Sequence, residues 1–228
     1  MSRIRKAYQV RFRTLLQAAR ARRLEQGVQW LVEAAQRLAA EEHLLPVDAF
    51  HRIYDTLASK PSFRRLAFRP APARFWCDAG LGGLARWLRA AGYEAFWRPD
   101  VDDDELLREA RKAEAAILTT DSMLMERRVL RDGLIPALWL PPALGIPGQL
   151  AQVFREFGLK AGQPRCMSCG GELERGDKEA LRERIPPRTY RWLSEFFTCR
   201  QCDKLFWHGT HWLKIQEHLR TLGMESRL

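Results

Sequence analysis

Apolar residues in the first sixty positions recur three or four apart, as they do along one face of an α-helix. Two series follow this spacing: Ile4, Tyr8, Phe12 and Leu15, then Leu31, Ala34, Ala35 and Leu38. No proline interrupts residues 2–44, so the pattern predicts one long helix, or two with a break at Gly27. Pro46 can begin a further helix. We therefore predict an α-helical segment over residues 1–70, closed by the proline-bearing stretch 69–72.

From residue 74 the pattern changes to short apolar runs that alternate with helical spacing. The runs that predict strands are 74–77, 94–97, 115–119 and 135–140. The segments that predict helices are 81–91, 103–112, 122–130 and 147–157. Strands that alternate with helices of about ten residues are typical of βαβ units and a parallel sheet. We expect a small three-layer α/β domain over residues 71–160.

A third unit, residues 161–228, contains two Cys-x-x-C pairs and ends in an amphipathic segment from residue 211 onward. The pairs are Cys166 with Cys169 and Cys199 with Cys202. Four thiolates at this spacing predict a closed, tetrahedral structural zinc site, a Cys₄ zinc ribbon. Redox-active pairs are the alternative, but neither pair follows a strand of a βαβ unit. The fifth cysteine, Cys77, lies in an apolar strand and is expected to be an inert core residue.

The charge is unevenly distributed around a net value of +10. Residues 1–70 carry 14 basic and 6 acidic side chains, whereas residues 71–160 carry 12 and 13. A basic flank beside an acid-rich middle favours a polyanion as partner, although a basic surface can also serve solubility alone. The chain has no apolar run long enough for a transmembrane helix and no apolar signal-peptide core, and five cysteines fit a reducing compartment. We therefore expect a cytoplasmic protein without a membrane partner.

Aspartates lie where three predicted elements of the middle domain begin or end. Asp78 follows the first strand, Asp121 follows the third, and residues 102–104 are three aspartates before the second helix. Because the carboxyl ends of parallel strands share one edge of a sheet, these side chains are expected to lie close together. Clustered carboxylates stay ionised only beside a cation, and oxygen ligands suit Mg²⁺ or Mn²⁺. The alternative is that each aspartate only caps a helix or a turn.

The motifs of the middle and last units resemble one known family. Residues 75–93 (FWCDAGLGGLARWLRAAGY) look like the opening of the Mut-seven C-terminal RNase domain family, a PIN-like nuclease fold. Residues 102–107 (DDDELL) resemble its second acidic motif, and residues 118–121 (LTTD) resemble the third, in which the family usually has Thr-Arg-Asp; Thr120 departs from it. Residues 206–212 (FWHGTHW) resemble its terminal Trp-x-Gly-x-His-Trp signature. The resemblance covers residues 74–216 and leaves the N-terminal segment outside.

The resemblance implies a metal-dependent ribonuclease that hydrolyses RNA phosphodiester bonds with Mg²⁺ or Mn²⁺, beside a structural zinc. The resemblance assigns Asp78, Asp103 and Asp121 as metal-binding and catalytic acids, with Asp104 as the substitute for Asp103.

On the first helix of the middle domain, Arg86 or Arg89 could contact a phosphate, the alternative being a solvated surface residue. His211 and Trp212 could stack on or bond to a base, the alternative being that Trp207 and Trp212 pack the ribbon onto the nuclease domain. The basic flanks would grip the RNA backbone.

Two alternatives remain at this point. The same PIN-like fold could bind RNA or a protein without cleaving it. It could also be a toxin-type nuclease that a partner regulates, with residues 1–70 as an arm for homo-oligomerisation. Leu31, Ala35 and Leu38, on one helical face, would then pair between chains.

Overall fold

The computed structural model describes residues 3–58, 60, 72–131 and 133–225. Its α-helices are α1 (Arg3–Ala18), α2 (Leu24–Glu41), α3 (Pro46–Ala58), α5 (Gly82–Ala90), α6 (Asp103–Lys112), α7 (Arg128–Arg131), α8 (Ile146–Phe157), α9 (Pro187–Trp192) and α10 (Thr210–Glu225). Its 3₁₀ turns are η1 (Ala79–Leu81), η2 (Leu124–Glu126) and η3 (Arg182–Arg184). Its strands are β1 (Arg74–Cys77), β2 (Glu94–Phe96), β3 (Ala116–Thr119), β4 (Ala137–Trp139), β5 (Leu173–Gly176), β6 (Phe196–Cys199) and β7 (Leu205–Trp207). The boundary expected near residue 70 lies outside the described residues.

The central sheet consists of β1 to β4, all parallel, in the order β2-β1-β3-β4. From β1 the chain adds β2 on one side and then crosses over to add β3 on the other side. The order of the strands therefore reverses between β1 and β3. In open parallel sheets such a switch point opens a crevice at the carboxyl ends of the two strands. Here those ends carry Asp78 and Asp121.

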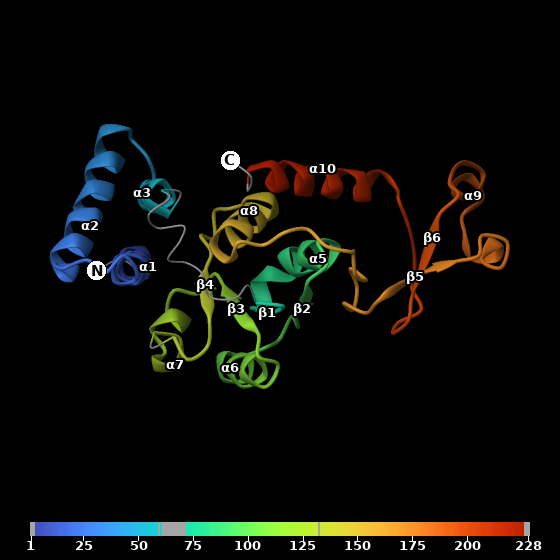
Figure 1. Ribbon diagram of the computed structural model, residues 1–228, viewed down its shortest axis with the longest axis horizontal. Helices are drawn as coiled ribbons and strands as arrows, with labels where there is room; N and C mark the ends of the chain where they lie inside the picture. The colour runs from blue at the N-terminus through green and yellow to red at the C-terminus, as the bar shows by residue number, and fades with distance from the viewer. Residues whose placement is uncertain (1–2, 59, 61–71, 132, 226–228) are drawn as a thin grey trace.

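The sheet is covered on both faces, which confirms the mixed α/β architecture expected from the sequence. Alternate residues of β1 point to opposite faces: Phe75 packs with α5 and α8, whereas Trp76 packs with α6 and α7. Figure 1 shows α5 and α8 on one side of the strands and α6 and α7 on the other. Since both faces are dry, all four residues of β3 are buried, as expected for a central parallel strand.

The helices α1, α2 and α3 pack against the α/β unit through one shared apolar core. The ring of Tyr8 in α1 lies 5.3 Å from that of Phe50 in α3 and 5.3 Å from that of Trp139 at the end of β4. These helices form the end of the molecule beyond β4 (Figure 1). The segment before the sheet is therefore joined to it by direct side-chain packing.

The helical break in the N-terminal segment was placed wrongly at Gly27. The chain turns at residues 19–23, where Arg20 has a left-handed backbone (φ +53°), and Gly27 lies inside α2. A Cβ atom at Gly27 would lie 2.9 Å from Cδ1 of Leu16. The glycine therefore permits close packing of α1 on α2 and does not end a helix.

The face proposed to pair between chains is used inside the chain. Leu31 and Ala35 are buried in the core that α2 shares with α1 and α3, and Leu38 is half-buried. Pairing of two copies through these residues would require this core to open, so that interpretation is corrected.

The helix expected over residues 122–130 is also divided. Arg127 has extended backbone (φ −58°, ψ 131°) and separates η2 from α7. Its side chain forms an ion pair with Asp104. A continuous helix would direct the Arg127 side chain elsewhere.

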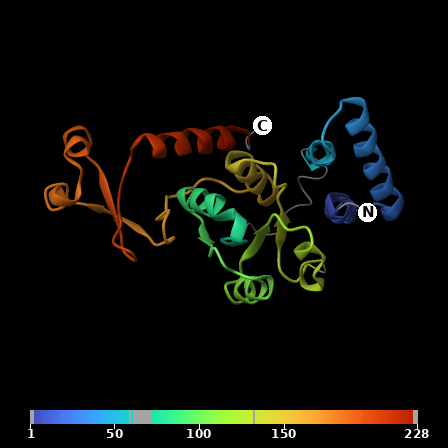
Figure 2. The ribbon, with the colours of Figure 1, turned by 180° about the vertical axis from the view of Figure 1, so that it is seen from behind.

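The last unit contains the antiparallel sheet β5-β6-β7 and then returns to the α/β unit. The small sheet has its own minor core around Leu181, Ile185 and Phe196. Helix α10 leads back from it and packs Ile215 and Leu219 against the core of α5 and α8. Figure 2 shows α10 spanning the distance between the small sheet and α8. No helix within the described residues has the length and apolar character that crossing a membrane requires.

Candidate functional site

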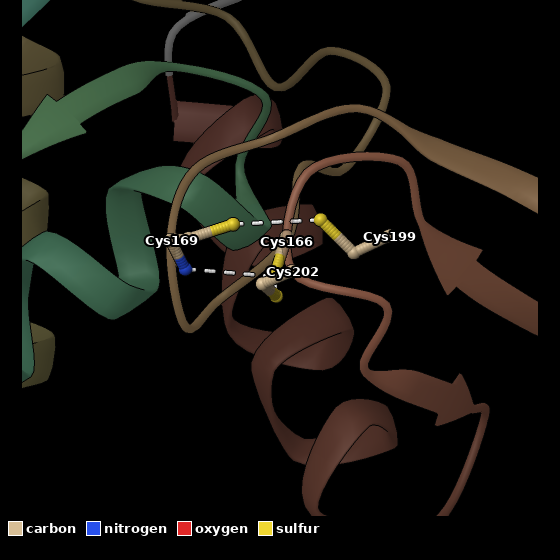
Figure 3. Close-up of side chains that lie close together, drawn as sticks. All are labelled: Cys166, Cys169, Cys199 and Cys202. Carbon is tan, nitrogen blue, oxygen red and sulfur yellow. Dashed lines mark hydrogen bonds between the residues drawn. The ribbon is translucent and has the colours of Figure 1, made fainter.

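The four cysteines expected to bind zinc come together, as Figure 3 shows. The Sγ atoms of Cys166 and Cys202 are 3.6 Å apart, those of Cys169 and Cys199 are 3.4 Å apart, and all four lie within 4.8 Å of one another. Tetrahedral zinc with Zn–S bonds of about 2.3 Å needs sulfur atoms roughly 3.8 Å apart. The four thiols therefore fit a closed metal site, and zinc is the ion that this ligand set favours.

Backbone N–H groups of the two loops point at the sulfur atoms. Cys169 donates to Sγ of Cys166 over 3.5 Å, and Gly171 donates to Sγ of Cys169 over 3.4 Å. Burial raises the pKa of Cys199, but N–H groups of Cys202 and Gln201 outweigh it and lower that pKa to about 7. A Cβ atom on Gly171 would lie 2.9 Å from Sγ of Cys199, so this loop requires glycine. The loop N–H groups thus favour the thiolate of Cys199, whereas burial raises the pKa of Cys166 and of Cys169, so a bound cation would be needed to hold those two as thiolates.

Arg89 connects this cysteine cluster to the α/β unit, which corrects its expected role as a phosphate contact. It is only 6% exposed. Its Nε donates to the carbonyl of Ala95 over 2.7 Å, and its Nη1 donates to the carbonyls of Met167 and Ser168 over 3.1 and 2.7 Å. The guanidinium is therefore committed to the backbone of the first cysteine loop.

The structure describes only one of the two other side chains that were expected to contact RNA. Arg86, one turn earlier on α5, is exposed and stays a candidate phosphate contact. His211 is the second residue of α10, but its side chain lies outside the described part of the chain. Cys77, as expected, is fully buried, and this burial raises the pKa of its thiol.

Asp78 lies at the carboxyl end of β1 and is held from two sides. Its Oδ1 accepts a hydrogen bond from the N–H of Gly80 at 3.0 Å. Its Oδ2 accepts from the hydroxyl of Thr119 at 2.7 Å, the N–H of Thr120 at 2.6 Å and the hydroxyl of Thr120 at 3.2 Å. Oδ2 is therefore fully used within the protein, whereas Oδ1 keeps room for a further partner.

The three consecutive aspartates before α6 have three different roles. Asp102 is the N-cap, and its side chain accepts from the N–H of Glu105 at 2.8 Å. Asp104 points away and pairs with Arg127, and its side chain is 74% exposed. Asp103 is the one whose charge is affected by Asp121. The capping interpretation holds for Asp102, whereas Asp103, which is exposed, stays the candidate among the three for the acid that faces the third strand.

Asp121 follows β3 on the same edge. Its N–H donates to the hydroxyl of Thr119 at 2.9 Å, and its Oδ1 accepts from the N–H of Met123 at 2.7 Å. Burial and the negative charge of Asp121 raise the pKa of Asp103. The charge of Asp121 thus acts on Asp103 across this edge of the sheet, and a bound cation would offset it.

The acidic site is more open than the cysteine cluster. Within the described residues, the four cysteines form the single group of three or more ligand atoms of His, Cys, Asp or Glu within 4.8 Å of one another. Asp78, Asp103 and Asp121 share an edge but do not converge that tightly. Since Mg²⁺ usually takes one or two carboxylates and fills its other positions with water, an open pair of acids still fits this ion.

The structure adds residues to the acidic edge that the sequence did not single out. Thr119 is fully buried and fixes both Asp78 and the backbone of Asp121 through one hydroxyl. Thr120, which departs from the usual arginine of the family motif, also bonds to Asp78. Arg127 lies beside Asp104, and its positive charge acts to lower the pKa of Asp103. The Thr-Thr-Asp sequence could have indicated the first two, whereas Arg127 depends on the turn after η2.

Comparison with known proteins identifies a family for the region that contains these residues. A family model, the Mut7-C RNAse domain, matches residues 73–219, which is well over half of the chain and includes both the acidic edge and the four cysteines. No curated protein and no solved structure matches the chain. The helices α1 to α3 lie before the matched region. The chain therefore belongs to the Mut7-C RNAse domain family.

Proposed function

We propose that this protein is a divalent-metal-dependent ribonuclease whose acidic site lies at the carboxyl ends of β1 and β3. Its family of RNase domains indicates a nuclease-type function. The observation that carries the finer proposal is the shared edge at the switch point of the sheet, where Asp78 and Asp121 follow β1 and β3 and the negative charge of Asp121 raises the pKa of Asp103. Such a pair is suited to hold a cation.

The three carboxylates have different roles in the proposed site. In this proposal Asp103 and Asp121 supply oxygen ligands, and Asp78 supplies its Oδ1, which accepts one hydrogen bond within the protein. Thr119 and Thr120 fix the orientation of Asp78, so this acid needs little rearrangement to act. A bound Mg²⁺ or Mn²⁺ supplies positive charge for the phosphate oxygens and activates water for attack on phosphorus. An ionised carboxylate at this edge can also accept the proton of the attacking water.

Basic residues near the acids support RNA as the substrate. Lys6 of α1 lies 3.4 Å from Glu126 of η2, so the basic helix α1 runs beside the turn that follows Asp121. Arg127, after the third strand, pairs with Asp104, and the exposed Arg86 lies on α5, the helix that follows Asp78. These cations can attract the phosphate backbone, and the binding should weaken with salt.

The experiment that tests the proposal is cleavage of a mixed pool of single-stranded and structured RNA with Mn²⁺, Mg²⁺ or chelator. We expect cleavage that needs the divalent ion and falls about 100-fold or more in Asp103→Asn and in Asp121→Asn. Asp104→Asn is the matched control, because it removes an adjacent charge that points to Arg127. It should retain activity within a few-fold.

Two outcomes would contradict the proposal. Cleavage that proceeds without a divalent ion, or that is unaffected by Asp103→Asn and Asp121→Asn, would separate the activity from these acids. Absence of cleavage together with salt-dependent RNA binding would favour a non-catalytic binding module. Zinc content is measured after chelation, so that damage to the cysteine cluster is not mistaken for loss of the acidic site.

A further inference from the structure

A groove of about 620 Å³ lies between the small sheet and the start of α10, away from the acidic edge. Its lining comes from the linker before the first cysteine loop, from the loop itself, from β5 to β7 and from α10: Gln163, Pro164, Arg165, Met167, Leu173, Phe197, Leu205, Phe206, Trp207, His208, Gly209 and Trp212. The lining is mainly apolar and aromatic. A groove of this size can admit a group as large as a nucleotide.

Three rings of the groove lie in a row, two of them stacked on each other and the third tilted. The ring of His208 lies 5.4 Å from that of Trp212 with an angle of 11° between the planes, and the ring of Phe197 lies 5.2 Å from that of His208. Flat aromatic walls of this kind stack on nucleobases with little regard to sequence. The rings come from β6, from the turn after β7 and from α10, so folding is needed to bring them together.

The charge around the groove suits a polyanion. None of the lining residues is acidic, and Arg165 is held in place because its Nε donates to the carbonyl of Gly170 at 2.7 Å. The carboxylate nearest to His208 is Glu195, whose Oε2 lies 3.8 Å from Nδ1 of His208. Glu195 is paired with Arg175 at 3.2 Å, so its charge is offset. The exposed Lys204 adjoins the groove residue Leu205.

We propose that this groove binds a nucleobase of single-stranded RNA, at a position distant from the bond that is cut. This inference rests on the proposed ribonuclease function. An apolar side chain of a protein partner would fill the same space, but it would not need parallel rings and an acid-free lining with an arginine.

The position of the groove sets a minimum length for its RNA. Asp78 precedes the start of α5, whereas Arg89, near the other end of α5, bonds to Met167 of the groove. The nine residues of α5 extend about 14 Å, and Asp78 and the groove lie toward opposite ends of this helix. At about 3.4 Å per stacked nucleotide, an RNA must span roughly four or more nucleotides to occupy both.

The test compares the affinity of a labelled single-stranded RNA of about 20 nucleotides for matched variants, measured by fluorescence anisotropy. All variants carry Asp121→Asn and no divalent ion is added, so that the RNA is not cut. His208→Ala and Trp212→Ala should weaken binding about 5- to 100-fold, and Trp212→Phe should restore most of it. Trp192→Ala is the control, because Trp192 is 80% exposed on α9 and does not line the groove.

A second readout uses cleavage by chains with intact acids. His208→Ala should raise KM for the long RNA with little change in kcat, and it should leave the cleavage of an RNA of about three nucleotides unchanged. Unchanged affinity in both His208→Ala and Trp212→Ala would overturn the proposal, as would an equal loss for the short and the long RNA. Zinc content shows whether each variant folds. If Trp212→Ala does not fold, the test depends on His208→Ala, because His208 is partly exposed and its substitution should be tolerated. A failure of the ribonuclease proposal would instead appear as absent cleavage, with the binding result still measurable.

Discussion

Asp103 carries a charge that the folded protein disfavours. Asp103 is exposed, but partial desolvation and the carboxylate of Asp121 raise its pKa, so the folded chain holds this proton more tightly than the unfolded chain does. Ionisation of Asp103 therefore lowers the free energy of unfolding as the pH rises through its raised pKa, and a bound cation removes this loss of stability. A residue that is unfavourable alone and favourable with an ion is typical of a functional site.

The pKa of Asp103 can be measured directly by NMR titration of its side-chain carboxyl. We expect a pKa above the usual aspartate range in the protein without a divalent ion, a lower pKa after Asp121→Asn, and a lower pKa again in the wild type with Mg²⁺. For the same reason, cleavage should decline as the pH falls into the range of this raised pKa. An Asp103 pKa that does not respond to Asp121→Asn would mean that the two carboxylates are not neighbours.

Arg89 and Arg86 lie three residues apart on α5, but the same substitution should lower the free energy of unfolding strongly at Arg89 and hardly at Arg86. Arg89→Met leaves the carbonyls of Ala95, Met167 and Ser168 without their donor, so we expect a loss of about 2–4 kcal/mol in the free energy of unfolding. Arg86→Met should change it by less than about 0.5 kcal/mol, because Arg86 is exposed. Urea unfolding of both variants checks this, and equal effects would show that the buried contacts of Arg89 contribute little.

At the scale of elements, the alternation of short apolar runs with helical spacing was enough to predict the parallel sheet. Its strands begin and end within two residues of the expected positions, since strands buried on both faces leave an unbroken apolar signal. Gly27 was misread because glycine can mark a helix end or a close helix contact, and only the position of Leu16 decides. The role of Arg89 depends on carbonyls 78 and 79 residues later in the chain, which no local pattern reveals.

The acidic site was predictable in part for the same reason. Strand ends placed Asp78 and Asp121 at one edge of the sheet. The choice among the three aspartates of residues 102–104 was not predictable, because a shift of one residue in the helix start rotates each side chain by about 100°. The structure begins α6 at Asp103, which makes Asp102 the cap.

The small antiparallel sheet should depend on its metal. Its own core contains few buried residues, with Leu181, Ile185 and Phe196 at the centre, so zinc held by the four cysteines would supply much of its stability. Removal of zinc by a strong chelator should therefore expose the amides of β6 to rapid hydrogen exchange while those of β3 stay protected. Protection of β6 that survives verified zinc loss would contradict this account.

At the scale of the whole molecule, the N-terminal helices are fixed to the α/β unit by a buried ionic contact as well as by the shared core. Nη2 of Arg11 lies 2.9 Å from Oε1 of Glu156 in α8, and the hydroxyl of Tyr54 donates to Oε2 of the same glutamate at 2.8 Å. The guanidinium also lies 3.8 Å above the ring of Tyr54. A basic helix held in this way keeps a constant position relative to the acids.

Arg11→Met should lower the free energy of unfolding by about 3–5 kcal/mol, because it leaves the carboxylate of Glu156 inside the interface without its cation. Adding Glu156→Gln should recover part of that loss, since the unpaired charge is then removed. Thermal or urea unfolding of the single and double variants measures this coupling. Additive effects of the two changes would show that the contact does not join α1 to α8.

The most direct test of the central claim is the location of Mn²⁺ in a crystal soaked in that ion, found by its anomalous scattering. We predict a peak about 2.1 Å from carboxylate oxygens of Asp103 and Asp121, near Oδ1 of Asp78, that disappears in Asp121→Asn, while the zinc peak among the four cysteines remains. Anomalous peaks at the cysteines but none at the acidic edge would contradict the account, because these aspartates would then not hold the ion on which cleavage is proposed to depend.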